Sequence, residues 1–223
     1  MRCRVCGTDG CLPLWIGADE TVWERCWCCF SDSSNALYDP AMYNPFYMTH
    51  HAQAESREAR LEQLRSNVEW FRDYKPQCAG RDFVDVGHCD GLMLTAMQDD
   101  GWRVHGFDVF PEANLGPHTT IAPVFRANLF PQRYQALNCR EVIEHVPGWR
   151  QMLVEMREAL AHGGLLQLQT PRPTPGVQTA GYQRAHLQLF SPLALRYELE
   201  RIGFSILDIR LWDLGQAFMA KRV

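Results

Sequence analysis

Residues 81–108 read R-D-F-V-D-V-G-H-C-D-G-L-M-L-T-A-M-Q-D-D-G-W-R-V-H-G-F-D, and this stretch decides the fold. The apolar run Phe83–Val86 predicts a strand, and Gly87 and Gly91 bracket a tight turn before a helical pattern begins. Trp102–Phe107 predicts a second strand, which ends at an aspartate. In a parallel sheet, a glycine loop and an acidic residue so placed meet at the carboxyl edge, where nucleoside ligands bind. The stretch therefore predicts an α/β fold with a nucleoside site.

The first acidic residue of the loop favours a cationic ligand over a dinucleotide. The pattern Asp85-x-Gly87-x-x-x-Gly91 begins with a carboxylate, which would repel the pyrophosphate that G-x-G-x-x-G loops bind. The pattern resembles motif I, D-x-G-x-G-x-G, of the class I methyltransferases that use S-adenosylmethionine. Cys89, beside His88, replaces the middle glycine of that motif. Either this cysteine displaces the loop, or it adopts ordinary backbone angles and packs as a small apolar group.

Later segments resemble the same family in the same order. Arg140–Pro147, R-E-V-I-E-H-V-P, resembles its E-V-x-E-H-[VI] segment. His186–Ser191, H-L-Q-L-F-S, resembles an H-L-x-x-F-[ST] signature of its sugar and secondary-metabolite branch. The aspartate that usually opens the strand before the first segment is here Gln135. By resemblance the chain is identified as a type 11/23-like methyltransferase with an amino-terminal four-cysteine zinc ribbon.

This resemblance implies a Rossmann-like seven-stranded sheet with helices on both faces, plus the small ribbon. Strands are expected at 83–86, 102–107, 124–127, 134–139, 165–170, 204–211 and 216–221, the last two as an antiparallel hairpin. Helices are expected at 49–74, from Pro147 to a stop at His162-Gly163-Gly164, and after Ser191, which would cap a helix opened by Pro192. The expected domains are 1–47, ribbon and aromatic linker; 48–76, a bridging helix; and 77–223, the cofactor-binding domain.

The resemblance also assigns roles to residues. Asp108 would accept the ribose hydroxyls, and Asn128 would face the adenine amino group. The full cofactor-binding set that it implies is Asp85, Gly87, His88, Cys89, Gly91, Asp108, Val109, Asn128, Leu129, Cys139 and Arg140. Methyl transfer needs one base, and His186, at the end of an expected lid loop, is the first candidate. His145 is the second, and each histidine has a packing or loop-fixing role as its alternative.

Cysteine pairs near the amino terminus predict a structural zinc site. The spacing C-x2-C occurs at Cys3 and Cys6 and again at Cys26 and Cys29, and two such pairs can close a tetrahedral four-thiolate site around Zn²⁺. Cys28 could replace Cys29 as a ligand. Gly7 follows the first pair, whereas Phe30 follows the second and is expected to be strained there. Buried free cysteines without a metal are the alternative interpretation.

The composition bounds the class of protein. The 223 residues are 46% hydrophobic and 22% charged, which is typical of a globular chain. A net charge of −4 offers no basic field for a nucleic-acid backbone, so a small-molecule partner is favoured. No apolar run approaches the ~20 residues of a membrane span. The metal-like cysteine spacing favours a reducing compartment, and we expect a cytoplasmic protein.

Together these patterns lead to one expected function and two alternatives. We expect an S-adenosylmethionine-dependent methyltransferase that acts on a small molecule, with a sugar or natural-product hydroxyl as the acceptor. The first alternative is an RNA base methyltransferase whose ribbon binds RNA, against which the acidic charge weighs. The second is a non-catalytic protein of the same fold, suggested by the departures at Cys89 and Gln135.

Overall fold

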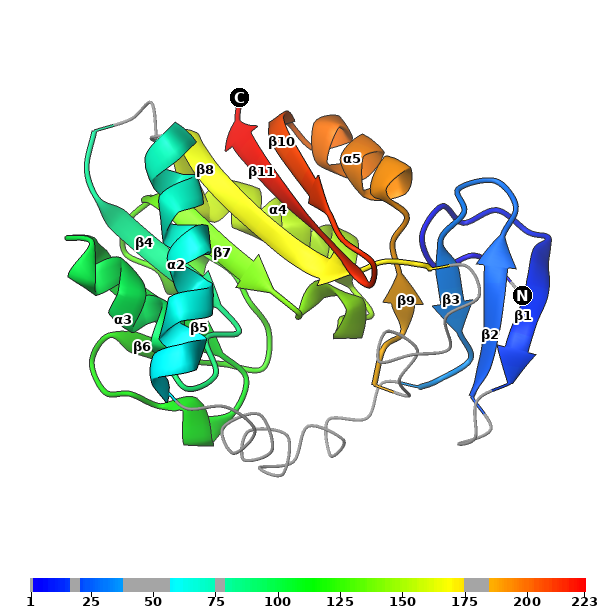
Figure 1. Cartoon of the computed structure of the whole chain (residues 1–223), viewed down its shortest axis with the longest axis horizontal. Helices are drawn as coiled ribbons and strands as arrows, with labels where there is room; N and C mark the ends of the chain where they lie inside the picture. The colour runs from blue at the N-terminus through cyan, green and yellow to red at the C-terminus, as the bar shows by residue number, and fades with distance from the viewer. Residues whose placement is uncertain (1, 17–20, 38–56, 75–78, 175–184) are drawn as a thin grey trace.

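The computed structural model describes residues 2–16, 21–37, 57–74, 79–174 and 185–223, and two sheets organise them (Figure 1). The larger sheet has seven strands in the order β10-β11-β8-β7-β4-β5-β6. They are β4 (Asp82–Val86), β5 (Arg103–Asp108), β6 (Thr119–Ile121), β7 (Tyr134–Arg140), β8 (Leu160–Pro171), β10 (Phe204–Leu211) and β11 (Gly215–Arg222). Strands β4 to β8 pair in parallel, and β10 and β11 form an antiparallel hairpin on β8. The predicted seven-stranded α/β sheet and its terminal hairpin are confirmed.

Helices cover both faces of this sheet. Helices α2 (Arg57–Tyr74) and α3 (Leu92–Asp99) share one buried cluster with Phe83 of β4. Helices α4 (Trp149–Ala159) and α5 (Pro192–Arg201) share the other cluster with Val84 and Val86. Neighbouring residues of β4 therefore face opposite layers, as the alternation of a strand requires. None of the helices in the described ranges is long and apolar enough to cross a membrane.

Two sequence-based boundaries are wrong. The strand expected at 124–127 lies instead at β6, Thr119–Ile121, because these β-branched residues pair with β5. Pro123, which lacks an N–H, comes two residues after the strand ends. His162-Gly163-Gly164 does not stop a helix, since α4 ends at Ala159 and these residues lie in β8. A Cβ at Gly164 would lie 3.2 Å from the carbonyl oxygen of Tyr134 on β7, so glycine permits the close approach of two strands where their register shifts.

The smaller sheet combines the amino-terminal ribbon with a strand from much later in the chain. Its order is β1 (Cys11–Ile16), β2 (Val22–Cys26), β3 (Asp32–Ser34) and β9 (Gln188–Leu189). Residues 32–34 form β3, which the sequence analysis did not predict, because they pair with β2 on one side and β9 on the other. The aromatic linker, the start of the first expected helix and most of the expected lid lie outside the described residues.

The ribbon and the larger sheet share buried contacts. Trp149 at the start of α4 packs in one cluster with Cys3 and Val5, and its Nε1 donates to the carbonyl oxygen of Arg4 at 3.3 Å. The backbone N–H of Ser191 donates to the Ser31 hydroxyl at 2.9 Å. The Ser191 hydroxyl also accepts from the N–H of Ala194 at 3.2 Å, which confirms it as the cap of α5.

Candidate functional site

The glycine loop after β4 turns back against β5. Gly87 has φ 76°, its N–H donates to Phe107 O at 2.8 Å, and a Cβ there would lie 2.4 Å from Cγ2 of Val142. Only glycine fits this position without rearrangement. Cys89 also has positive φ, 53°, so the alternative in which it adopts ordinary backbone angles is wrong. The cysteine occupies the left-handed conformation that the glycine of the family motif would adopt without strain.

Asp108 lies at the carboxyl end of β5 and organises the neighbouring backbone. Its Oδ1 accepts from the N–H groups of Val109 at 2.7 Å and Phe110 at 3.1 Å. Its Oδ2 accepts from the N–H of Cys89 at 3.0 Å, which ties the glycine loop to β5. The carboxylate is thus oriented by three backbone donors before any ligand binds.

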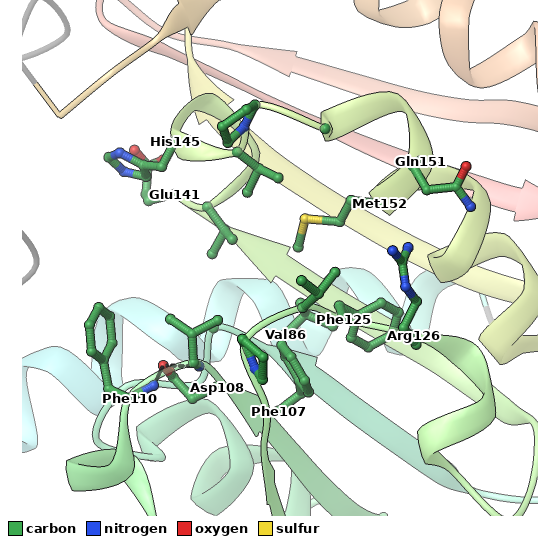
Figure 2. Close-up of a pocket in the computed structure, with 18 of the residues that line it drawn as sticks. Val86, Phe107, Asp108, Phe110, Phe125, Arg126, Glu141, His145, Gln151 and Met152 are labelled. Atoms are coloured by element: carbon green, nitrogen blue, oxygen red, sulfur yellow. Dashed lines mark hydrogen bonds between the residues drawn. The ribbon is translucent and has the colours of Figure 1, made fainter. Parts of the chain in front are cut away.

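A cavity of about 470 Å³ opens at the carboxyl ends of β4 and β5 (Figure 2). In Figure 2, Asp108 and Phe110 lie on one side of the cavity and Glu141 and His145 on the other. Five residues predicted from the sequence line it: Gly87, Cys89, Asp108, Val109 and His145. The lining also includes residues that the sequence analysis missed, among them Val86, Phe107, Phe110, Phe125, Arg126, Glu141, Val142, Gln151 and Met152. An apolar, aromatic wall with a few directed polar groups suits a nucleoside ligand.

Other members of the predicted cofactor set lie outside the cavity lining. Asp85 is buried within the sheet, where its Oδ1 accepts from Nδ2 of Asn138 on β7 at 2.7 Å. Burial raises the pKa of Asp85 to about 7. Cys139 is buried one residue before the exposed Arg140 at the end of β7.

The remaining residues of the predicted cofactor-binding set pack against the sheet or lie in the turns around the cavity. The ring of His88 packs against β5, because a Cβ at Gly106 would lie 2.4 Å from its Cδ2. Gly91, with φ 75°, precedes the first turn of α3. Asn128 and Leu129 are exposed in a short 3₁₀ turn, η3 (Ala127–Leu129), beyond the cavity residues Phe125 and Arg126.

Gln135, one of the two departures from the family pattern, lies far from the cavity mouth in the sheet. It is the second residue of β7, and its Oε1 accepts from the backbone N–H of Asp82 at 2.8 Å. This contact joins the amino ends of β7 and β4, whereas the cavity lies at the carboxyl ends. Gln135 therefore does not belong to the lining of the candidate cofactor site.

The two candidate bases lie together in a buried cluster. His145 ends the 3₁₀ turn η4 (Ile143–His145), and its ring centroid is 4.6 Å from that of His186. Both imidazoles are buried, and burial followed by the proximity of His186 lowers the pKa of His145 to about 3. Glu144, which is fully buried, lies beside them, with its Oε1 3.7 Å from Nε2 of His145. The sequence placed His145 near the cofactor but gave no signal that His186 would contact it.

The four predicted zinc ligands converge. The Sγ atoms of Cys3, Cys6, Cys26 and Cys29 lie within 4.8 Å of one another, and the exposed Cys28 is not part of that group. The N–H of Gly7 donates to Cys3 O at 3.0 Å, and the N–H of Phe30 makes the matching bond to Cys26 O at 2.9 Å. Phe30 has φ 57°, as expected from the missing glycine. This donor set fits a tetrahedral metal site.

Residues 48–209 match a family described as a methyltransferase domain. The chain belongs to this family. It is 28% identical over 128 residues to the ubiquinone biosynthesis O-methyltransferase of Saccharophagus degradans, an alignment that covers 52% of each chain. The chain thus spans about half the length of that curated relative.

Solved methyltransferases share the fold of the larger sheet. A SAM-dependent methyltransferase from Archaeoglobus fulgidus has a TM-score of 0.64 at 16% identity and covers 79% of this chain and 99% of its own. The magnesium protoporphyrin IX methyltransferase of Synechocystis PCC 6803, solved with bound SAH, has a TM-score of 0.60 at 16% identity and covers 83% of this chain and 98% of its own.

Proposed function

We propose that this protein transfers the methyl group of S-adenosylmethionine to a hydroxyl of a small molecule. The observation that carries the proposal is the oriented Asp108 carboxylate facing an apolar cavity at the carboxyl edge of the sheet. The cofactor would supply a methyl group that its sulfonium already activates. The protein then has to align this group with the acceptor and to remove one acceptor proton.

The cavity residues divide between the two tasks. Asp108 would accept from the ribose, and the apolar side chains of Val109, Phe110 and Phe125 would hold the adenine ring. The carboxylate of Glu141, on the opposite wall, suits the positive charge of the methionine part and its sulfonium. His145 reaches the cavity, with His186 behind it, so the acceptor proton would leave on this side, with His186 as the first candidate base.

An oxygen acceptor is favoured by the curated relative, whose name assigns it O-methyl transfer. A sugar or natural-product hydroxyl remains the proposed acceptor class, on the resemblance of the segment from His186 to Ser191 to that branch of methyltransferases. The net charge of −4 supports a small molecule over RNA.

A structural Zn²⁺ held by Cys3, Cys6, Cys26 and Cys29 completes the proposal. Four thiolates leave no open position for a substrate, so the ion would stabilise the ribbon and take no part in methyl transfer. Because the ribbon packs on Trp149 and pairs with β9, its stability also bears on the segment that carries His186.

The test has two stages. Calorimetry with S-adenosylhomocysteine should give one binding site per chain, and labelled methyl transfer should then occur to hydroxylated small molecules but not to RNA. His186→Ala should retain the affinity for the cofactor product and lower transfer by ~10²–10⁴ if the imidazole assists proton removal. Absence of nucleoside binding would favour a non-catalytic protein of the same fold, and methyl transfer to RNA would favour an RNA base methyltransferase.

A further inference from the structure

Three potential metal ligands meet in the interior beside the candidate cofactor cavity. One carboxylate oxygen of Glu144 and one ring nitrogen each of His145 and His186 lie within 4.8 Å of one another. The relative exposures of the residues are 0%, 7% and 3%. Ligand atoms around an ion with bonds of about 2.0–2.2 Å are typically about 3–3.5 Å apart, so a small inward movement of the side chains would close the site.

Hydrogen bonds to surrounding groups hold two of the side chains, and the segment that carries the third, in place, as is usual for metal ligands. Nδ1 of His145 lies 2.9 Å from the carbonyl oxygen of Ala185 and can only donate to it, which directs Nε2 of that ring toward Glu144. Oε2 of Glu144 accepts from the Thr170 hydroxyl at 2.9 Å. The backbone N–H of Leu187 donates to Glu144 O at 2.9 Å, so the segment that carries His186 is fixed to the turn that carries the other two ligands.

The environment of Oε1, the second carboxylate oxygen of Glu144, points independently to a ligand. Oε1 is fully buried and has no hydrogen-bond partner among the residues that the structure describes. A buried carboxylate oxygen without a donor is costly, because nothing replaces its lost hydration. Nε2 of His145 lies 3.7 Å from this oxygen, and the carboxyl of Glu141 interacts with that of Glu144. A cation placed between the carboxylate and the two imidazoles would satisfy this oxygen.

We infer that Glu144, His145 and His186 form a second metal site, separate from the ribbon, for a divalent first-row transition ion. Two imidazoles and one carboxylate are a ligand set typical of such ions, and they leave coordination positions open. This inference rests on the proposed function for its role, because the open side of the site adjoins the cavity that His145 and Glu141 line.

The ion would bind the acceptor oxygen. Coordination lowers the pKa of a bound hydroxyl, and the proton would pass to the carboxylate of Glu141 on the same wall. The oxygen then forms a bond to the methyl carbon while the bond from that carbon to sulfur breaks and its electron pair stays on sulfur. In this arrangement His145 and His186 hold the ion, and Glu141 takes the role of base that the proposed function gives first to His186, while the methyl transfer itself is unchanged.

Mn²⁺ titration followed by electron paramagnetic resonance tests the site in the full-length chain with its ribbon zinc retained. Mn²⁺ binds least tightly in the divalent series and prefers oxygen and nitrogen, so it should not displace zinc from four thiolates. We expect about one bound Mn²⁺ per chain, and at least tenfold weaker binding in Glu144→Gln and in His186→Gln. Glu144→Gln keeps the shape of the side chain, and thermal unfolding of each variant reports whether it folds.

His162→Gln is the matched control. His162 is an exposed histidine near the amino end of β8, opposite the carboxyl edge where the cavity lies, and its loss should leave Mn²⁺ binding unchanged. The inference would be overturned if the wild-type chain bound neither Mn²⁺ nor Co²⁺. Unaltered Mn²⁺ binding in a folded Glu144→Gln variant would also overturn it. Calorimetry with S-adenosylhomocysteine on the same samples separates the two proposals, since cofactor binding without ion binding refutes this site alone.

Discussion

Replacing Asp108 by asparagine is the sharpest test of where the cofactor binds. The carboxylate already accepts two backbone N–H groups on Oδ1 and one on Oδ2. A carboxylate offers about four acceptor positions, so Oδ2 keeps room for at least one ribose hydroxyl. In Asp108→Asn the amide oxygen can still serve Val109 and Phe110, but an NH₂ group then faces both the N–H of Cys89 and the ribose.

The magnitude follows from the one bond that is lost to the ligand. A hydrogen bond to a charged group contributes about 1.5–3 kcal/mol, which corresponds to an increase in Kd for S-adenosylhomocysteine of about tenfold to about 150-fold. The free energy of unfolding should also fall by about 1–3 kcal/mol, because two donors now meet at Cys89. Calorimetry measures the first quantity, and denaturant unfolding without ligand measures the second.

Asp90→Asn is the matched control for charge. Asp90 lies in the same glycine loop, where it pairs with Arg60 at 2.7 Å, but it does not belong to the cavity lining described above. The Kd of the Asp90→Asn variant for S-adenosylhomocysteine should change by less than about twofold, since the charge of Asp90 is already paired with Arg60 and a surface ion pair contributes little free energy. Equal Kd values for the wild-type protein and a folded Asp108→Asn variant would refute the placement of the ribose.

Three further predictions concern the ribbon, the buried acid and the strained cysteine. Cys6→Ser should abolish zinc binding and lower the unfolding temperature of the whole chain, because the ribbon shares packing with Trp149, whereas Cys28→Ser should do neither; zinc retained in Cys6→Ser would contradict the site. Burial keeps Asp85 protonated in the folded state up to a pH of about 7 while the unfolded chain ionises near pH 4, so stability should fall by about 3–4 kcal/mol between these pH values. Asp85→Asn should lack that component, and parallel pH profiles of unfolding free energy for the two proteins would refute it. Cys89→Gly should bind S-adenosylmethionine more tightly, since it relieves a positive φ and removes a side chain from the cavity lining; equal or weaker affinity by calorimetry would show that Cys89 imposes no penalty there.

Local patterns were enough to predict the elements that local interactions decide. The run Phe83–Val86, the glycine loop and the cap at Ser191 depend on residues within a few positions of one another. The paired cysteines predicted a four-thiolate cluster because the C-x2-C spacing itself places two sulfurs at each knuckle.

Contacts between distant segments decided what the sequence did not predict. β3 and β9 contain three and two residues, too few for a periodic signal; β3 pairs with β2 and β9, and β9 is a strand through its pairing with β3. His162-Gly163-Gly164 has the composition of a helix stop, yet the packing of β8 on β7 makes it part of a strand. The cluster at Glu144 was missed for the same reason, since His186 lies more than 40 residues further along the chain and meets it through tertiary contacts such as the bond from the N–H of Leu187 to Glu144 O.

The small sheet connects the ribbon to the chemistry proposed for the cavity. The Ser34 hydroxyl on β3 donates to the carbonyl oxygen of His186 at 2.9 Å, and the N–H of Ser34 donates to Leu187 O at 3.1 Å. The imidazole of His186 is therefore carried by a backbone that the ribbon holds on one side and the turn at Glu144 on the other. In the described chain three residues other than glycine have positive φ, namely Phe30 in a cysteine knuckle, Cys89 in the cofactor loop and Glu141 in the cavity wall. A left-handed backbone at a residue other than glycine lowers the stability of the fold by about 1–2 kcal/mol, and it persists only where the surrounding contacts hold the backbone in place. At these three positions, therefore, the shape of the cysteine knuckle, the cofactor loop and the cavity wall is kept at a cost in stability.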